Sequence, residues 1–212
     1  MIVKILVVFY GWRKIFKRIA CANSMTLMND ASFLRQREQW LDYLRTARSA
    51  EAQQLYWDEL FPALERSFCE RYRSSQRYDW LVLPCGLESW CYILLIKAMQ
   101  PQNVYFLGTE EFRDTFLDII VQKTGLKASQ YVIDTLRYDE LDITEVYEKI
   151  RARLPVFVGK KIVMDLTRGK RIMSVGAGIV GAFFGFDLVY IDELWVDEFK
   201  RGMPGSEKLV LV

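Results

Sequence analysis

Three basic residues stand almost side by side in the segment MDLTRGKRIM, which covers residues 164–173. Arg168, Lys170 and Arg171 flank Gly169, between a short apolar run and a helix-like stretch. Cations at the positive end of a helix repel one another unless an anion lies among them, and glycine lets an anion approach the backbone closely. The segment therefore predicts a phosphate-binding loop; the alternative is three solvated basic side chains in an ordinary loop.

The stretch that begins with Arg171, RIMSVGAGIVGAFFG, is rich in glycine for a helix. Gly176, Gly178 and Gly181 would each cost about 1 kcal/mol relative to alanine, so we expect close packing against another helix or a symmetry mate. The P-loop pattern is absent, and GAGIVG does not open a helix after a first strand as a dinucleotide fingerprint does. Thr167 is expected either to cap this helix or to hydrogen-bond a ligand.

The sequence contains no histidine, which excludes Ser-His-Asp triads, Cys-His pairs and histidine general bases. Its four cysteines form no CxxC pair, so no usual zinc set and no secretory disulfide framework is present. We therefore expect no metal, no cofactor and no dedicated catalytic residue, and buried thiols in a reducing cytoplasm. A net charge of +2 is too small for general binding of long nucleic acid, so a nucleotide must be met locally.

The elements that must position the basic loop alternate from Tyr78 onward. Apolar, strand-like runs are YDWLVLPC, NVYFLGT, SQYVIDTL, KKIVMDLT and FDLVYIDELW, with helix-like stretches between them, and a Gly-Met-Pro-Gly turn precedes a last strand at 208–212. Such alternation with short connections predicts βαβ units and right-handed crossovers. The expected fold is α/β, a Rossmann-like open, mostly parallel sheet with helices on both faces, preceded by an N-terminal helical segment.

Ligands of such sheets bind at the carboxyl ends of the strands, where loops meet helix N-termini. The loops to consider are 85–90, 108–112, 135–138 and 166–173. The candidate ligand-binding residues on them are Gly86, Leu87, Glu88, Ser89, Trp90, Gly108, Thr109, Glu110, Thr167, Arg168, Gly169, Lys170, Arg171 and Met173.

The basic loop resembles that of the CARF family, the CRISPR-associated Rossmann-fold domains, whose common pattern is D-x-T-G-G-T-K-x-M. The matching positions are Asp165, Leu166, Thr167, Gly169 and Met173. Arg171 stands where lysine is usual, while Arg168 and Lys170 replace a glycine and a threonine and so add charge to the loop. The resemblance extends over residues 78–212 in the order of strands and loops.

This resemblance implies a sensor of cyclic oligoadenylate, with cyclic tetra-adenylate as the expected ring, in type III CRISPR antiviral defence. It further implies that loop 86–90 and the basic loop line a pocket on the axis of a homodimer, each subunit holding half of a two-fold symmetric ring. Ring size and pairing of dimers into tetramers stay open. An alternative that the family offers is a metal-independent ring nuclease, in which Lys170, Arg171 and Ser89 would serve.

The expected domain boundaries are 1–75 for an N-terminal segment and 76–212 for the Rossmann-like domain. Drawn as a helix, Met1–Ala22 is amphipathic and basic: the apolar side carries Ile2, Ile5, Phe9, Trp12, Phe16 and Ile19, and the other side carries Lys4, Gly11, Lys14 and Arg18. This pattern is typical of a helix lying in a membrane interface. The alternative is a strand or helix docked on the protein's own core.

Residues 29–74 read as two amphipathic helices, and Pro62 should kink or restart the second one. We expect the output of the sensor to come from residues 1–75, through association of the first 22 with an anionic membrane; the protein would be cytoplasmic or held at the inner membrane. A third possibility is a regulator or scaffold whose N-terminal helices bind a partner.

Overall fold

The computed structural model describes residue 27, residues 30–137 and residues 143–212. The interpretation of Met1–Ala22 as an amphipathic membrane helix lies outside these residues. Among those described, no helix combines the length and the apolar character needed to cross a bilayer.

Six strands form the main sheet, in the order β3-β2-β1-β4-β5-β8. Their bounds are β1 Trp80–Pro84, β2 Asn103–Gly108, β3 Tyr131–Thr135, β4 Ile162–Asp165, β5 Asp187–Asp192 and β8 Lys208–Leu211. The first five pair in parallel, and β8 runs antiparallel to β5 because it returns through a short hairpin of β6 (Trp195–Val196) and β7 (Arg201–Gly202). The predicted α/β class with an open, mostly parallel sheet is confirmed.

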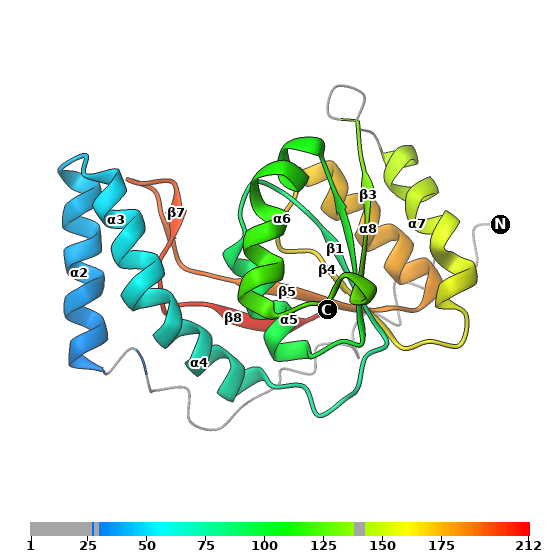
Figure 1. The fold of residues 1–212 in the computed structure, drawn as a ribbon, viewed down its shortest axis with the longest axis horizontal. Helices are drawn as coiled ribbons and strands as arrows, with labels where there is room; N and C mark the ends of the chain where they lie inside the picture. Colours follow the sequence, from blue (N-terminus) through cyan, green and yellow to red (C-terminus); the bar gives the residue numbers. More distant parts are fainter. Residues whose placement is uncertain (1–26, 28–29, 138–142) are drawn as a thin grey trace, which may run out of the picture.

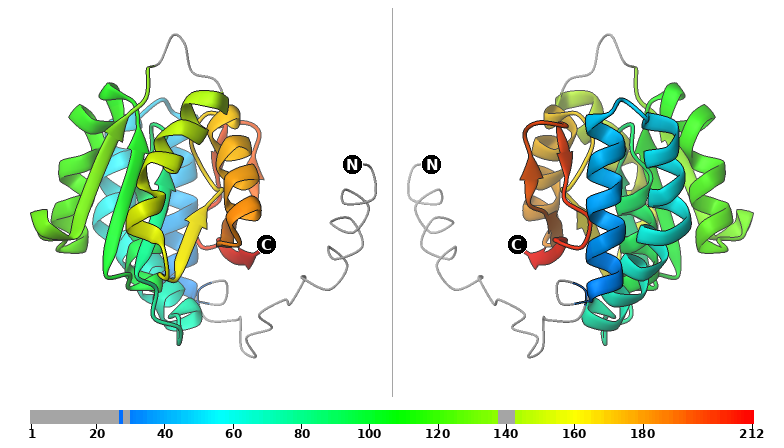
Figure 2. Two further views of the ribbon diagram at one scale, coloured as in Figure 1. Left: turned by 90° about the vertical axis from the view of Figure 1, so that its right-hand side faces the viewer. Right: turned by 90° about the vertical axis from the view of Figure 1, so that its left-hand side faces the viewer.

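Helices cover both faces of this sheet (Figures 1 and 2). They are α2 Ala31–Arg45, α3 Ser49–Leu55, the π-helical turn η2 Tyr56–Leu60, α4 Phe61–Tyr72, α5 Trp90–Met99, α6 Glu110–Thr124, the 3-10 turn η3 Ala128–Gln130, α7 Ile143–Phe157 and α8 Arg171–Phe184. Successive strand residues point to opposite faces, so Leu81 and Leu83 join the core under α5 and α6, whereas Val82 joins the core under α7 and α8.

The N-terminal helices form an outer layer on the α5 side of the sheet (Figure 1). Three of their buried side chains, Phe33, Phe61 and Phe68, belong to the same apolar cluster as α5. Burial of each contributes about 1.5–3 kcal/mol to stability. The domain boundary near residue 75 stays a prediction, but a chain cut there would lose a covering layer of the sheet.

Pro62 lies in the first turn of α4, directly after the π-helical turn. Proline is tolerated there because the first backbone N–H groups of a helix have no intrahelical partner. The expected restart of the second helix at Pro62 is therefore confirmed, and η2 is the irregular turn at which it occurs.

Candidate ligand-binding site

A cavity of about 340 Å³ opens at the carboxyl ends of β1, β2 and β4. It is lined by Cys85, Gly86, Leu87, Glu88, Thr109, Arg168, Gly169, Lys170 and Met173. The loops after β1, β2 and β4 thus meet here, as the strand order requires. Apart from Cys85, every residue of this lining is among the candidates named from the sequence.

The loops after β1 and β4 touch backbone to backbone. A Cβ atom added to Gly86 would lie 2.9 Å from the amide nitrogen of Gly169. Gly169 itself has a backbone φ of +100°, a conformation that residues other than glycine rarely adopt. Tyr92, which sequence reasoning missed, holds the first loop: its hydroxyl accepts a 2.6 Å hydrogen bond from the Gly86 amide. The two glycines are therefore needed for the loops to share one cavity.

The amino end of α8 faces this junction without a side-chain cap. Lys170 occupies the N-cap position but makes no capping hydrogen bond, and the first turn holds no acidic residue. Within the described residues, no hydrogen-bond acceptor is found for the backbone amides of Arg171 and Ile172. Free amides at the positive end of a helix are suited to an anion such as phosphate.

Arg168, one of the three basic residues of this loop, is paired within the chain. Its guanidinium lies 3.1 Å from a Glu88 carboxylate oxygen, is paired with Glu193, and sits 5.1 Å above the Trp90 ring centroid. Its side chain is 19% exposed. Arg168 therefore joins the loop after β1 to the segment after β5, while Lys170 and Arg171 are the exposed cations of the motif.

Asp165 and Thr167 fix the start of the basic loop. The Thr167 amide and hydroxyl both donate to Asp165 Oδ1, and the Thr167 hydroxyl oxygen accepts a 2.8 Å hydrogen bond from the Ile191 amide. Burial raises the pKa of Asp165 to about 7, against the opposing effect of the Thr167 hydrogen bonds. Thr167 thus ties β4 to β5 and does not cap α8.

The remaining candidates lie near the cavity but do not line it. Ser89 is 5% exposed at the N-cap of α5, and Trp90 lies under Arg168. Gly108 packs against the Phe112 ring, and Glu110 is exposed in the first turn of α6. The position of Ser89 does not favour the direct role that the ring-nuclease alternative gives it.

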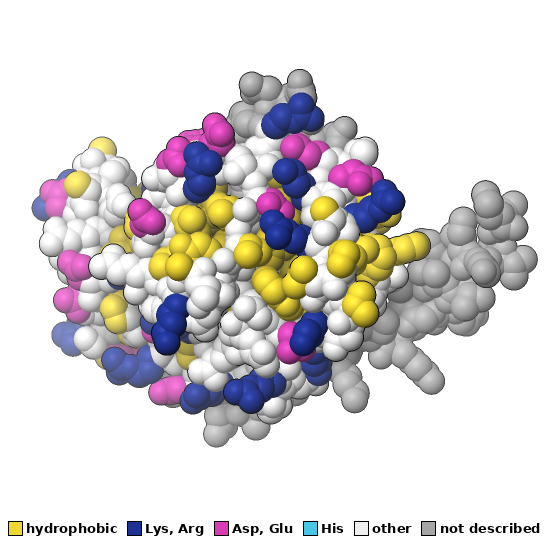
Figure 3. Space-filling model, turned by 45° about the vertical axis from the view of Figure 1, so that its right-hand side comes forward, with side chains coloured by type: hydrophobic (Ala, Val, Ile, Leu, Met, Phe, Trp, Pro, Cys, Tyr) yellow, Lys and Arg dark blue, Asp and Glu magenta, His cyan; other side chains and the backbone are white. Residues whose placement is uncertain are grey.

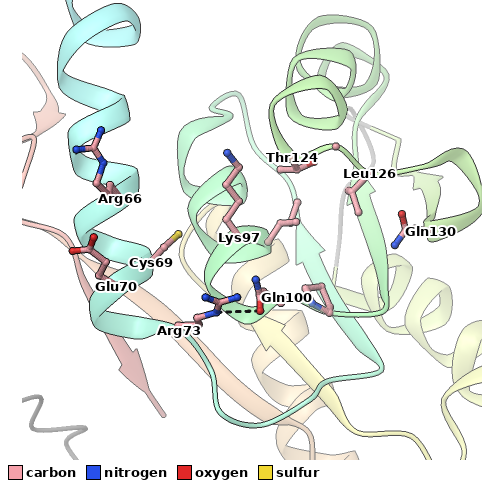
Figure 4. A pocket seen from close by; sticks show the side chains of 12 residues that line it. Arg66, Cys69, Glu70, Arg73, Lys97, Gln100, Thr124, Leu126 and Gln130 are labelled. Carbon is pink, nitrogen blue, oxygen red and sulfur yellow. Dashed lines mark hydrogen bonds between the residues drawn. The ribbon is translucent and has the colours of Figure 1, made fainter.

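A wider groove, of about 500 Å³, lies at the opposite end of the sheet between α4, α5 and α6 (Figure 4). The carboxyl ends of α5 and α6 lie at this groove, where backbone carbonyls point outward and an anion is disfavoured. Within this groove, Lys97 pairs with Glu65 at 2.7 Å, and Arg73 donates to Gln100. Nowhere in the described part of the chain do three metal-ligating side chains gather.

Sequence similarity to one curated CRISPR protein agrees with the resemblance drawn from the basic loop. No protein-family model matches the chain. The chain is 28% identical over 180 residues to the CRISPR system endoribonuclease Csm6 of Thermus thermophilus, an alignment that covers 80% of this chain and 38% of that protein. The chain thus spans well under half the length of this curated relative.

Two solved structures are also similar. Csm6 of Enterococcus italicus bound to cyclic hexa-2'-fluoro-hexa-dAMP matches 54% of this chain and 33% of its own, with TM-score 0.44 and 16% identity. Can2 of Sulfobacillus thermosulfidooxidans in complex with cyclic tetra-adenylate matches 65% of this chain and 38% of its own, with TM-score 0.44 and 14% identity. A TM-score of 0.44 is too low for either likeness to bear on the function of this chain.

Proposed function

We propose that this chain is a CARF-type receptor for cyclic oligoadenylate in type III CRISPR antiviral defence. The observation that carries the proposal is the uncapped amino end of α8, which meets Gly169 and Lys170 at the mouth of a cavity and carries a second exposed cation, Arg171. The sequence similarity to Csm6 of Thermus thermophilus supports it. The endoribonuclease activity in that protein's name is not part of the proposal, because this chain aligns with 38% of it.

A ring of linked nucleotides needs more room than this cavity offers. The cavity of about 340 Å³ is at the lower end of pockets for small ligands, which span about 300–1,000 Å³. Two copies related by a two-fold axis would present two such cavities to one ring, each copy binding the phosphates nearest to its own α8. The receptor we propose is therefore a homodimer.

The outer face of α8 supports a second copy as its partner. Val175, Ile179 and Phe183 are spaced by four residues and are 52%, 55% and 77% exposed. They form a continuous apolar line that begins one turn after the ligand loop, so an interface here would bring both ligand loops to the same axis. Figure 3 shows further exposed apolar side chains on the adjoining side, which carries α7.

The dimer is tested by Ile179→Glu, which places a charge in the centre of this line. We expect sizing with light scattering to report a dimer for the natural chain and a monomer for the variant, with loss of ring binding. Ile119→Glu is the matched control, because Ile119 is 40% exposed on α6, which packs on the opposite face of the sheet from α8. A natural chain that stays monomeric with and without ring would contradict the dimer.

Ligand binding is tested by thermal unfolding with cyclic tetra-adenylate, cyclic hexa-adenylate or linear tetra-adenylate. A ring at 100 times its Kd adds about 2.7 kcal/mol to the free energy of unfolding, which corresponds to a rise in Tm of about 5–10 °C for a chain of this size. We expect at least one ring to produce this rise and the linear form to produce less. No shift with either ring would overturn the receptor.

We further propose that the output comes from residues 1–75, with Met1–Ala22 associating with anionic membrane. The support is the basic amphipathic pattern of this segment, since each Lys or Arg near such a surface contributes about 1 kcal/mol. The test is flotation with anionic liposomes of the full chain and of a chain that starts at Asp30, which keeps α2–α4 on the sheet. Equal absence of both from the liposome fraction would contradict a membrane output.

A further inference from the structure

The cavity has two chemically different sides. One side is formed by Gly169, Lys170 and the amino end of α8, where an anion is favoured. The other side is formed by the loop after β1, which contributes an apolar side chain, Leu87, and a carboxylate, Glu88. A carboxylate repels phosphate, so the second side must meet a different part of a nucleotide.

The Glu88 carboxylate is held in place with one oxygen left open. Its Oε2 accepts a 3.0 Å hydrogen bond from Trp90 Nε1 and lies 3.1 Å from Arg168 Nε. No donor from the described residues bonds its Oε1, and the side chain is 45% exposed where it lines the cavity. This carboxylate oxygen can therefore accept a hydrogen bond from a ligand.

The exocyclic amino group of adenine is a donor that fits this position. Guanine and uracil carry a carbonyl oxygen at the equivalent position, which a carboxylate would repel. Leu87, 48% exposed beside Glu88, offers apolar contact to the face of a base. Thr109 also lines the cavity, and its hydroxyl oxygen accepts from the Phe112 amide, which leaves the hydroxyl proton able to bond a ring nitrogen.

We infer that Glu88 reads the exocyclic amino group of the bound base and so makes the site selective for adenine over bases that carry a carbonyl there. This assignment rests on the proposed function, because it takes the ring to bind with its phosphates at α8. Glu88 then has two roles: Oε2 anchors Arg168, and Oε1 selects the base.

The test compares two rings that differ only in that amino group: cyclic tetra-adenylate and the same ring built from purine riboside, which has hydrogen in place of the amino group. For the natural chain we expect at least tenfold tighter binding of the adenylate ring, the usual effect of one hydrogen bond to a charged group. For Glu88→Ala we expect both rings to bind equally. Comparing ratios cancels any general weakening caused by the substitution.

Glu193→Ala is the matched control. Glu193 is the other carboxylate on Arg168, but it does not line the cavity, so this variant disturbs the same arginine and should keep the full preference for adenylate. Thermal unfolding without ligand confirms that the variants fold. If Glu88→Ala does not fold, Glu88→Gln replaces it, and the preference for the adenylate ring should fall because an uncharged amide oxygen accepts a weaker hydrogen bond from the amino group than a carboxylate does.

The outcomes separate the two claims. Loss of the preference in the Glu88 variant and its retention in Glu193→Ala would support the assignment. Equal binding of both rings by the natural chain, or an unchanged preference in Glu88→Ala, would overturn the assignment while the receptor stands. Failure of the natural chain to bind either ring would overturn the proposed function itself.

Discussion

The loops after β1 and β4 are two versions of the same strand, turn and helix unit, packed side by side. Their backbones meet at Gly86 and Gly169, so neither can move far without the other. The first loop leads into α5, whose N-cap residue Ser89 is buried and is preceded by the acidic Glu88. The second leads into α8, whose start is open and basic. The two joined loops thus present an acidic side and a basic side to one cavity, which suits a ligand with a base at one end and a phosphate at the other.

The largest effect should come from separating the two loops. In Gly86→Ala the new methyl group would lie 2.9 Å from the Gly169 amide nitrogen, and backbone atoms cannot yield as a flexible side chain can. We expect ring affinity to fall by about 100-fold or more and the free energy of unfolding by about 1–3 kcal/mol. Calorimetry and urea unfolding measure the two effects.

Gly159→Ala is the control for this change. Gly159 has φ +68° but open space around it, so alanine there costs only backbone strain of about 1 kcal/mol. Its affinity for the ring should equal that of the natural chain. If Gly86→Ala also bound the ring normally, the contact between the loops would have no part in the site.

The next effect concerns the basic loop alone. Lys170→Ala and Arg171→Ala should each weaken ring binding by about 1.5–3 kcal/mol, the usual strength of a hydrogen bond from a charged group. Arg151→Ala is a matched control, because Arg151 is exposed on α7 and does not line the cavity. Natural affinity in both loop variants would remove the β4–α8 loop from the site. Thr167→Ala should weaken ring binding less.

A smaller effect is expected from pH, through the carboxyl group that anchors the basic loop. Burial raises the pKa of Asp165 from 3.8 to about 7, so the folded state holds a proton that the unfolded state releases, and stability falls as pH rises from about 4 to about 7. In Asp165→Asn, the decrease in the free energy of unfolding over this pH range should be smaller by an amount on the order of 1–3 kcal/mol. Urea unfolding at pH 5 and pH 8 measures it.

A second buried carboxyl sets the background for that measurement. Burial raises the pKa of Glu207 to about 8. This group therefore also makes the stability of the fold decrease as pH rises from about 4.5 to about 8. Part of the slope should therefore persist in Asp165→Asn and disappear when Glu207→Gln is added. An identical slope in the natural chain and in Asp165→Asn would show that Asp165 is ionised in both states.

The smallest effect is expected in ring cleavage, which should be slow or absent. The chain has no histidine, and cations that hold the bound ring firmly give no preference to a transition state. Ser89→Ala should leave both binding and any turnover unchanged, because its side chain is 5% exposed and outside the cavity lining. Complete conversion of labelled ring within minutes, abolished by substitution of Arg171 or Ser89, would favour a ring nuclease.

The sequence predicts the elements well, because each strand and helix of this sheet carries its own periodicity and the turns between them are short. It also identifies the loops that meet at the cavity, since parallel strands end at one edge. It does not reveal Glu193 as a partner of Arg168, because 25 positions and two elements separate them. Nor does it reveal that Thr167 turns toward β5, since that depends on the close pairing of β4 with β5. Periodicity identifies elements, whereas side-chain partners follow from how those elements pack.

The most direct test of the receptor is calorimetric titration of the natural chain with cyclic tetra-adenylate, repeated with cyclic hexa-adenylate. If two copies each hold half of a ring, the titration should end at one ring per two chains for the preferred ring. The same preparation of Ile179→Glu should give little heat. Binding of one ring per chain with undiminished affinity in Ile179→Glu, or no heat with either ring, would contradict a dimeric receptor of cyclic oligoadenylate.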